Sequence, residues 1–224
     1  CTYCVIPKVR GSFRSFPIEY LVNQTKKLVE GGVKEIILVA QETTLYGVDL
    51  YGKKSLPKLL HNLGLIEGLE WIRILYCYPE EINDELIEAI KNEPKVCHYL
   101  DMPIQHASDN ILKRMGRRTS KQELTDIVAK LRREIPDIAL RTTLITGFPG
   151  ETDVDHEEVM QFIDECEFDR LGVFTYSREE DTVAAQMPDQ IDEEIKEKYR
   201  DELMQLQQEI SADRSAAMIG RIVR

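Results

Sequence analysis

Two cysteines at the start of the chain are the residues whose type and spacing most directly suggest chemistry. Cys1 and Cys4 stand three positions apart, and Lys8, Arg10 and Arg14 follow them before any acidic residue appears. Thiolates are soft ligands that suit zinc or iron–sulfur centres, and neighbouring cations favour the thiolate form. We therefore treat this segment as a candidate metal site.

The other cysteines do not complete such a site in the sequence. Cys77, Cys97 and Cys166 are isolated in apolar or helical runs, so we expect them to be small core residues. A zinc site needs a second pair at similar spacing. A thioredoxin-type pair would open a helix after a strand, whereas Pro7 and Gly11 favour a loop here. Two alternatives stay open: a third ligand lies upstream of the chain, or the pair is structural.

Length and composition indicate one α/β domain. The 224 residues suffice for a sizeable core, and 42% of them are hydrophobic and 31% charged. No apolar run approaches the roughly 20 residues of a membrane span, and no secretory signal is visible. Five cysteines at irregular spacing predict a reducing compartment, with the cytoplasm as the expected location. The chain opens on a cysteine, and its end at 219–224 is predicted to be the start of another strand, so we interpret it as the middle domain of a longer protein.

The net charge of −11 is unevenly distributed. Between Ser177 and Ile210 there are eleven Asp and Glu against four Lys and Arg, whereas the N-terminal segment is basic. An acidic surface disfavours broad contact with nucleic acid and favours a basic macromolecular partner. Solubility alone is the alternative explanation of this charge.

Apolar runs of strand length alternate with amphipathic runs along the chain. The predicted strands cover residues 35–40, 71–76, 96–100, 138–145 and 171–176. The predicted helices cover residues 18–30, 56–62, 82–91, 109–115 with Ser108 as cap, 121–134 with a Ser120–Glu123 capping box, 152–166 and 191–212. Continuous apolar runs, such as 35–40, predict strands covered on both faces. In repeated βα units they predict a parallel sheet with helices outside, curled into a full or partial barrel.

In such a sheet the ligand site lies beyond the carboxyl ends of the strands. The segments that follow the predicted strands are polar, and they are residues 41–43, 105–106, 147–151 and 177–180. We expect these segments to converge with Cys1 and Cys4 around one mouth.

Together these segments resemble the radical S-adenosylmethionine (SAM) domain of the methylthiotransferase family, nearly end to end. The matching motifs are Cys-Thr-Tyr-Cys-Val-Ile-Pro at 1–7, Ala-Gln-Glu-Thr-Thr at 40–44, Asp-Met-Pro-Ile-Gln-His-Ala-Ser at 101–108, Leu-Arg-Thr-Thr at 140–143, Gly-Phe-Pro-Gly-Glu-Thr at 147–152 and Phe-Thr-Tyr-Ser at 174–177. The Gln-His-Ala-Ser segment resembles the branch that modifies ribosomal protein S12. The sister branch, which modifies tRNA, usually has Gln-Ser-Gly-Ser there.

The chain departs from the family pattern in three places. The family motif is Cys-x-x-x-Cys-x-x-Cys, so Cys1 and Cys4 match its second and third cysteines, and the first falls four residues before the chain. Phe16 stands where an arginine is common, and Asp181 stands where glycine usually follows a Glu-Glu pair. With two of three ligands, the isolated chain is expected to hold a cluster weakly and to be inactive.

The resemblance also implies a domain organisation. Residues 1–212 match a radical SAM partial barrel, α/β in class, that is closed by a C-terminal helix. Residues 213–224 match the lead-in to a C-terminal β-barrel domain. That barrel and an N-terminal domain with a second 4Fe–4S cluster are absent from this chain.

The activity that the resemblance implies is radical SAM methylthiotransfer to an aspartate of S12. In the family, three cysteines hold a 4Fe–4S cluster and leave one iron open for SAM, whose cleavage gives a 5′-deoxyadenosyl radical. An electron donor protein is the other expected partner, with no membrane and no nucleic acid bound by this domain. One alternative is the tRNA-modifying enzyme of the same family, and another is a metal-free α/β interaction domain.

Roles for single residues follow from the same resemblance. The predicted cluster ligands are Cys1 and Cys4. The residues predicted to bind the cofactor are Tyr3, Gln41, Glu42, Thr43, Gln105, Arg141, Gly147, Phe148 and Tyr176. Tyr3 is placed against adenine, Glu42 at the methionine ammonium of SAM and Arg141 at its carboxylate, with packing or an ion pair as the alternatives. His106 is expected to be a hydrogen-bonded structural residue rather than a catalytic one, and His61, His98 and His156 show no ligand spacing.

Overall fold

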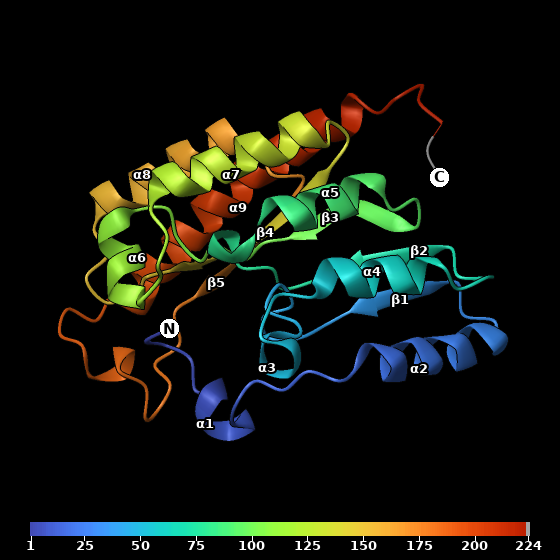
Figure 1. The fold of residues 1–224 in the computed structure, drawn as a ribbon. Coiled ribbons are helices and arrows are strands. Elements are labelled where there is room, and N and C mark those ends of the chain that lie inside the picture. The colour runs from blue at the N-terminus through green and yellow to red at the C-terminus, as the bar shows by residue number, and fades with distance from the viewer. Residues whose placement is uncertain (223–224) are drawn as a thin grey trace. The chain divides into compact units, whose positions relative to one another are not determined.

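The computed structural model of the chain describes residues 1–222 and divides into two compact units (Figure 1). The first unit comprises Cys1–Arg10, Ile104–Val128 and the chain from Leu140 onward. The second unit comprises Gly11–Pro103 and Ala129–Ala139. No helix of the described residues is long and apolar enough to cross a membrane.

The second unit is built on three parallel strands. They are β1 (Glu35–Leu38), β2 (Trp71–Ile74) and β3 (Val96–Asp101). Its helices are α2 (Ile18–Glu30), α3 (Val48–Tyr51), α4 (Leu56–Gly64), the 3₁₀ turn η1 (Pro79–Glu81) and α5 (Asp84–Asn92). Leucines and isoleucines of α4 and α5 are buried together with Ile72 and Ile74 of β2, which forms the core of this unit.

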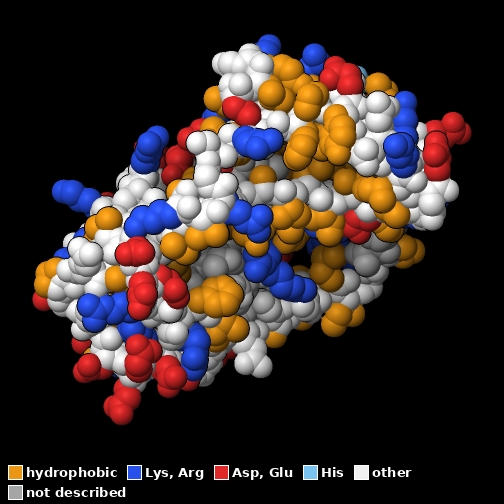
Figure 2. Space-filling view, turned by 90° about the horizontal axis from the view of Figure 1, so that it is seen from below, with side chains coloured by type: hydrophobic (Ala, Val, Ile, Leu, Met, Phe, Trp, Pro, Cys, Tyr) orange, Lys and Arg blue, Asp and Glu red, His pale blue; other side chains and the backbone are white. Residues whose placement is uncertain are grey.

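Strand β1 differs from its prediction. The apolar run at 35–40 predicted a strand covered on both faces, but β1 ends at Leu38, and Ile37 and Val39 are 50% and 63% exposed. Among the described residues β1 pairs with β2 only, so it is an edge strand, and a continuous apolar run does not show which of its faces is covered. Hydrophobic side chains reach the surface on the face shown in Figure 2.

The first unit contains two parallel strands and most of the helices. Its strands are β4 (Ala139–Thr146) and β5 (Arg170–Thr175), in register from Arg141 opposite Arg170 to Thr146 opposite Thr175. Its helical elements are α1 (Ile6–Arg10), α6 (Asp109–Met115), α7 (Lys121–Glu134, whose end falls in the second unit), α8 (Asp153–Cys166), η2 (Ala184–Gln186) and α9 (Glu193–Ala216). Helix α9 packs on β5 and on α8 (Figure 1).

Helix starts illustrate where local signals were sufficient. The Ser120–Glu123 capping box is confirmed, because the Ser120 N–H donates to the Glu123 carboxylate at 2.8 Å and the Glu123 N–H donates to the Ser120 hydroxyl oxygen at 3.3 Å. The predicted cap at Ser108 is different. Ser108 precedes α6, but its hydroxyl donates to Asp155 Oδ1 at 2.5 Å instead of accepting a helix N–H. A hydrogen bond to a carboxylate is stronger than a neutral one, so the α8 residue is the favoured partner.

Two further expectations about elements were wrong in part. The segment after Cys4 was predicted as a loop, but residues 6–10 form α1, with Pro7 in the first turn, where a missing N–H costs nothing. The closing helix was predicted to end at 212, whereas α9 continues to Ala216. Of the apolar end at 219–224, read as the start of a strand, Ile219 and Gly220 lie in a turn, and Val223 and Arg224 lie outside the described residues.

Candidate functional site

The cysteine segment is anchored to the first unit through Thr2. Its N–H donates to the Met115 carbonyl at 2.9 Å, and its hydroxyl donates to the Arg114 carbonyl at 2.9 Å. These carbonyls belong to the last turn of α6, which has no intrahelical donors for them. The Ala184 N–H of η2 donates to the Thr2 carbonyl at 3.0 Å. The segment that carries both cysteines is therefore held between α6 and η2.

Both cysteines of this segment are free thiols, and one has a cationic neighbour. Cys1 is exposed and Cys4 is half-buried. Arg117, which is buried, places its Nη1 atom 4.0 Å from Cys1 Sγ. A guanidinium beside sulfur suits an anionic ligand set. Sequence reasoning missed Arg117, because its separation of 116 residues from Cys1 leaves no local signal.

No group of three or more His, Cys, Asp or Glu side chains within residues 1–222 could hold a metal ion. Cys1 and Cys4 can supply two ligands. The predicted core positions of Cys77 and Cys166 are confirmed by their burial, whereas Cys97 is only half-buried.

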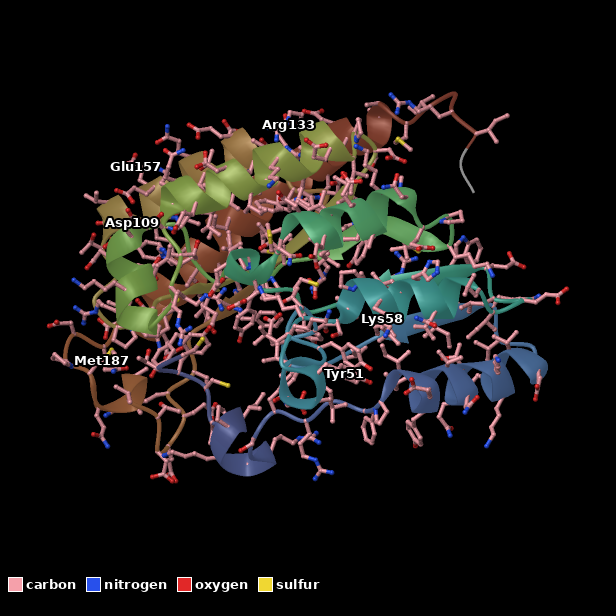
Figure 3. The ribbon with its side chains drawn as sticks, viewed as in Figure 1. Tyr51, Lys58, Asp109, Arg133, Glu157 and Met187 are labelled. Carbon is pink, nitrogen blue, oxygen red and sulfur yellow. The ribbon has the colours of Figure 1, made fainter. Side chains whose placement is uncertain are left out.

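Three aromatic side chains, one of them within the cysteine segment, pack against one another. The Tyr3 and Phe148 rings meet edge to face with centroids 6.1 Å apart, and the Phe148 and Tyr176 centroids are 5.3 Å apart. Phe148 and Tyr176 are buried in one cluster, against which Tyr3 and Met187 pack; Met187 is labelled in Figure 3. In this structure Tyr3 packs against the cluster, which is the alternative to its predicted contact with adenine. The Phe148 side chain fills the core, so the Phe148 backbone is the part that can face a ligand.

The turn after β4 is fixed by a buried carboxylate. Glu151 Oε2 accepts the N–H of Gly147 at 2.6 Å and the N–H of Phe148 at 3.0 Å. His106 Nε2 lies 3.3 Å from Glu151 Oε1, and His106 Nδ1 accepts the Ser108 N–H at 2.9 Å. Because Nδ1 is an acceptor, a neutral His106 carries its proton on Nε2, although Nε2 and Glu151 Oε1 do not form a hydrogen bond with each other in this geometry. These partners favour the structural role expected for His106.

Gln105 lies beside the second half of β4 in a strained conformation. Its φ is +72°, in the left-handed region that non-glycine residues rarely adopt. Two backbone hydrogen bonds hold it there: its N–H donates to the Thr143 carbonyl at 2.9 Å, and its carbonyl accepts the Ile145 N–H at 2.8 Å. Strain that is held in this way is often found at functional positions.

Arg141 lies at the opposite end of β4. It is opposite Arg170 and six residues before Gly147, which places it about 20 Å along the strand from the Gly147 turn at roughly 3.3 Å per residue. Its role at a SAM carboxylate stays a prediction that this position does not favour. Its guanidinium lies beside Gly172 of β5, and the alternative of an ion pair within the barrel stays a prediction as well.

Asp181, a departure from the family pattern, adopts a glycine-like conformation. Its φ is +62°, in the left-handed region that glycine adopts without strain and that Asp tolerates better than most residues. The Lys8 ammonium of α1 donates to its carbonyl. This hydrogen bond connects the exposed acidic segment after β5 to the segment that follows the cysteines.

In the second unit, the predicted residues 41–43 follow β1. Glu42 is buried, with Oε1 accepting the Thr44 N–H at 2.9 Å and Oε2 accepting the Tyr78 N–H at 3.0 Å. Burial raises the pKa of the Glu42 carboxyl to about 7, although these hydrogen bonds oppose the shift. Thr43 is buried and donates its hydroxyl to the Leu75 carbonyl at 2.6 Å, whereas Gln41 is exposed.

Comparison with known proteins assigns the family. The model of the radical SAM superfamily matches residues 1–163, which include the cysteine segment, Glu42, Gln105 and the Gly147 turn. The chain belongs to the radical SAM superfamily. Within this radical SAM chain, Tyr176 and all of α9 lie beyond the matched residues.

Several curated relatives of this radical SAM chain share one name. The ribosomal protein uS12 methylthiotransferase RimO of Lachnoclostridium phytofermentans is 65% identical over 221 residues, which cover 99% of this chain and 50% of that protein. RimO of Clostridium acetobutylicum is 54% identical over 224 residues, which cover 100% of this chain and 50% of that protein. The chain therefore spans about half the length of the curated relatives it matches.

Solved radical SAM structures share the fold. The methyltransferase TsrM from Kitasatospora setae, with cobalamin and a 4Fe–4S cluster bound, matches with a TM-score of 0.63 at 16% identity over 78% of this chain and 34% of its own. Methylornithine synthase PylB matches with a TM-score of 0.62 at 14% identity over 94% of this chain and 58% of its own. The predicted α/β fold, a partial parallel barrel of the radical SAM type, is confirmed.

Proposed function

We propose that this chain is the core of an enzyme that adds a methylthio group to an aspartate side chain of ribosomal protein S12. The observation that carries the proposal is the match to S12 methylthiotransferases, at 54–65% identity over essentially the whole chain. The motif at 105–108, Gln-His-Ala-Ser, supports the same branch of the family. The acidic segment from Ser177 to Ile210 suits a basic ribosomal protein better than a polyanionic tRNA.

The cofactors are a 4Fe–4S cluster and SAM, and the donor set of the chain fits the cluster. Cys1 and Cys4 are free thiols on a segment fixed to the protein, with the Arg117 guanidinium beside one sulfur. They supply two of three thiolates, and a cysteine four residues before Cys1 supplies the third. The group, when bound, supplies one-electron cleavage of SAM, and the protein provides orientation and shelter.

Different residues of the chain bind different parts of SAM. The backbone of Gly147 and Phe148 flanks the adenosine, with Gln105 beside it. Glu151 fixes this turn, because its carboxylate accepts both of these N–H groups and its own N–H donates to the Phe148 carbonyl at 2.9 Å. The Glu42 carboxylate receives the methionine ammonium. A cation at this buried carboxyl offsets the cost of its ionisation, which burial imposes.

The whole protein is proposed to contain more than this core. Residues 1–212 and the rest of α9 form the radical SAM core, and the following residues lead into a C-terminal β-barrel domain. An N-terminal domain carries a second 4Fe–4S cluster, and an electron donor protein reduces the enzyme. The chain spans half of its relatives, which leaves length for both domains. Cytoplasmic location follows from a cytoplasmic substrate.

The deciding experiment separates the two macromolecular substrates. The full-length enzyme, reconstituted anaerobically with iron and sulfide, is incubated with SAM and a sulfur source and with either S12 or prenylated tRNA. Mass spectrometry is expected to find a methylthio group on one S12 aspartate, and an S12 variant with asparagine at that aspartate serves as control. Modification of the tRNA alone would overturn the choice of substrate, and no SAM cleavage at all would support the metal-free interaction domain.

A further inference from the structure

Lys196 of α9 is a buried lysine at the end of the two strands of the first unit. Its exposed fraction is 3%, although it lies in a helix whose neighbouring residues are mostly exposed and charged. Lysine is almost never buried unless its ammonium has partners. Its position lies beyond the part of the chain that the radical SAM family model matches.

The aliphatic stem of Lys196 lies directly on Gly147. A Cβ atom at Gly147 would be 2.0 Å from Lys196 Cγ and 2.8 Å from its Cβ and Cδ, so the stem occupies the space that a side chain would need. Gly147 also has a φ of +70°, which glycine adopts without strain. The residue type at 147 and the position of the lysine stem are therefore matched to each other.

The polar atoms of Lys196 bind both strand ends. Its ammonium donates to the Tyr176 carbonyl at 3.1 Å and lies 5.3 Å from the centre of the Tyr176 ring, while its backbone carbonyl accepts the Thr146 hydroxyl at 3.2 Å. Thr146 is the last residue of β4, and Tyr176 directly follows β5. The ammonium is balanced by Glu193, one turn earlier in α9, at 2.7 Å.

Two buried charges thus confine the Gly147 turn from different elements. Glu151 binds the N–H groups of Gly147 and Phe148, and Lys196 covers Gly147 and ties it to the residues at both strand ends. A turn restrained on both sides does not have to be ordered when a ligand binds, which lowers the entropic cost of binding.

We propose that Lys196 is a positioning residue for SAM: it presets the Gly147–Phe148 backbone that flanks the adenosine, so that α9 controls SAM affinity without touching SAM. This inference rests on the proposed SAM-binding role of the turn. It predicts that changes at Lys196 alter the Kd and KM for SAM and leave kcat at saturating SAM nearly unchanged. A lysine that only stabilises the fold would instead change the unfolding temperature and leave KM as it is.

The test uses the full-length enzyme with its cluster reconstituted. Lys196→Ala removes stem and ammonium, Lys196→Met keeps most of the stem, and Lys198→Ala removes an exposed lysine two residues further along α9 as the matched control. The measurements are iron content, the Kd for SAM by equilibrium dialysis, the KM and kcat of SAM cleavage, and the thermal unfolding midpoint. The binding assays are run well below the lowest midpoint.

We expect Lys196→Ala to raise the Kd and KM for SAM about tenfold, with kcat within twofold of the parent and iron content unchanged. Lys196→Met should raise them about threefold, and Lys198→Ala should leave them unchanged. A lower unfolding midpoint with KM and Kd within twofold of the parent overturns the inference, as does an equal effect of Lys198→Ala. If Lys196→Ala does not accumulate as folded protein, Lys196→Met decides by the same criterion.

Gly147→Ala adds a test of direct contact. In the parent its added methyl group meets the Lys196 stem, whereas in Lys196→Ala part of that clash is absent. The loss of SAM affinity in the double variant should therefore be smaller than the product of the two single losses. Multiplicative losses would contradict the contact. A parent enzyme that binds no SAM would instead overturn the proposed function, and this inference with it.

Discussion

The two units fix their buried carboxylates with different partners. In the first unit, Glu151 binds the N–H groups of Gly147 and Phe148, and Lys196 of α9, 49 residues after Gly147, covers the same turn. The cysteine segment of this unit is anchored on α6 and η2. In the second unit, Glu42 binds the N–H groups of Thr44 and Tyr78, and burial raises its pKa to about 7.

Under the proposed function, this difference indicates that the two units contribute differently to the binding of a ligand. The first unit holds backbone and thiols in place through contacts between distant segments, so its contribution is geometry. The second unit holds a carboxyl group that is costly to ionise in the absence of a cation, so its contribution is a charge that a cationic ligand would stabilise. Substitutions that affect one unit at a time can separate these contributions.

The largest expected effect comes from the thiols of the two units. Cys4→Ala in the full-length enzyme should remove the share of the iron and of the visible absorption that belongs to the cluster of this core, because it removes one of three ligands. The second cluster in the N-terminal domain should remain, and the cleavage of SAM should be abolished. Cys77→Ala, which removes a buried thiol of the second unit, should leave both clusters and the cleavage of SAM intact. Iron analysis and SAM cleavage assays check this. A Cys4→Ala enzyme with full iron content and normal turnover would exclude the cluster assignment.

The sequence predicted those features that depend on neighbouring residues. The bounds of α2 are as predicted, and the Ser120–Glu123 box marks the start of α7, because capping needs only residues three positions apart. The βα alternation likewise follows from apolar periodicity. The cysteine motif was recognisable because its spacing is short.

The features that the sequence did not reveal depend on contacts between distant residues. In the sequence, Lys196 is one of many charged residues in an acidic helix, and no local pattern distinguishes it. Its burial depends on its contacts with Gly147 and Tyr176. The exposure of Ile37 in β1 depends on which neighbours cover the strand, and an apolar run is the same in either case. Arg117 lies near Cys1 for the same kind of reason.

The second expected effect is a pH dependence of stability that originates at Glu42. The carboxyl has a pKa of about 7 in the folded protein against 4.5 ordinarily, so between these values the folded state holds a proton that the unfolded state has released. Its contribution to stability therefore falls as pH rises from about 4.5 to 7, by on the order of 3 kcal/mol.

Glu42→Gln removes this titration. Urea unfolding of parent and variant at pH 5 and pH 7.5 measures it, and the stability of the variant relative to the parent should increase with pH. Any constant cost of fitting the amide between two N–H donors cancels in the difference between the two pH values. If the stabilities of parent and variant change in parallel between pH 5 and pH 7.5, Glu42 is ionised at both pH values. The contrast between the two units would then be lost.

The smallest expected effect concerns SAM affinity. If the second unit supplies the charge that receives the methionine ammonium, Glu42→Ala should weaken SAM binding about tenfold, or about 1.4 kcal/mol, at pH 8, where the carboxyl is ionised. The iron content and absorption spectrum should remain those of the parent, because the thiol ligands lie in the first unit. Anaerobic calorimetry measures the Kd, and S-adenosylhomocysteine, which keeps the ammonium but lacks the sulfonium charge, should lose the same factor. Unchanged SAM affinity with intact iron would restrict Glu42 to binding the N–H groups of Thr44 and Tyr78. The first unit alone would then account for the affinity of this core for SAM.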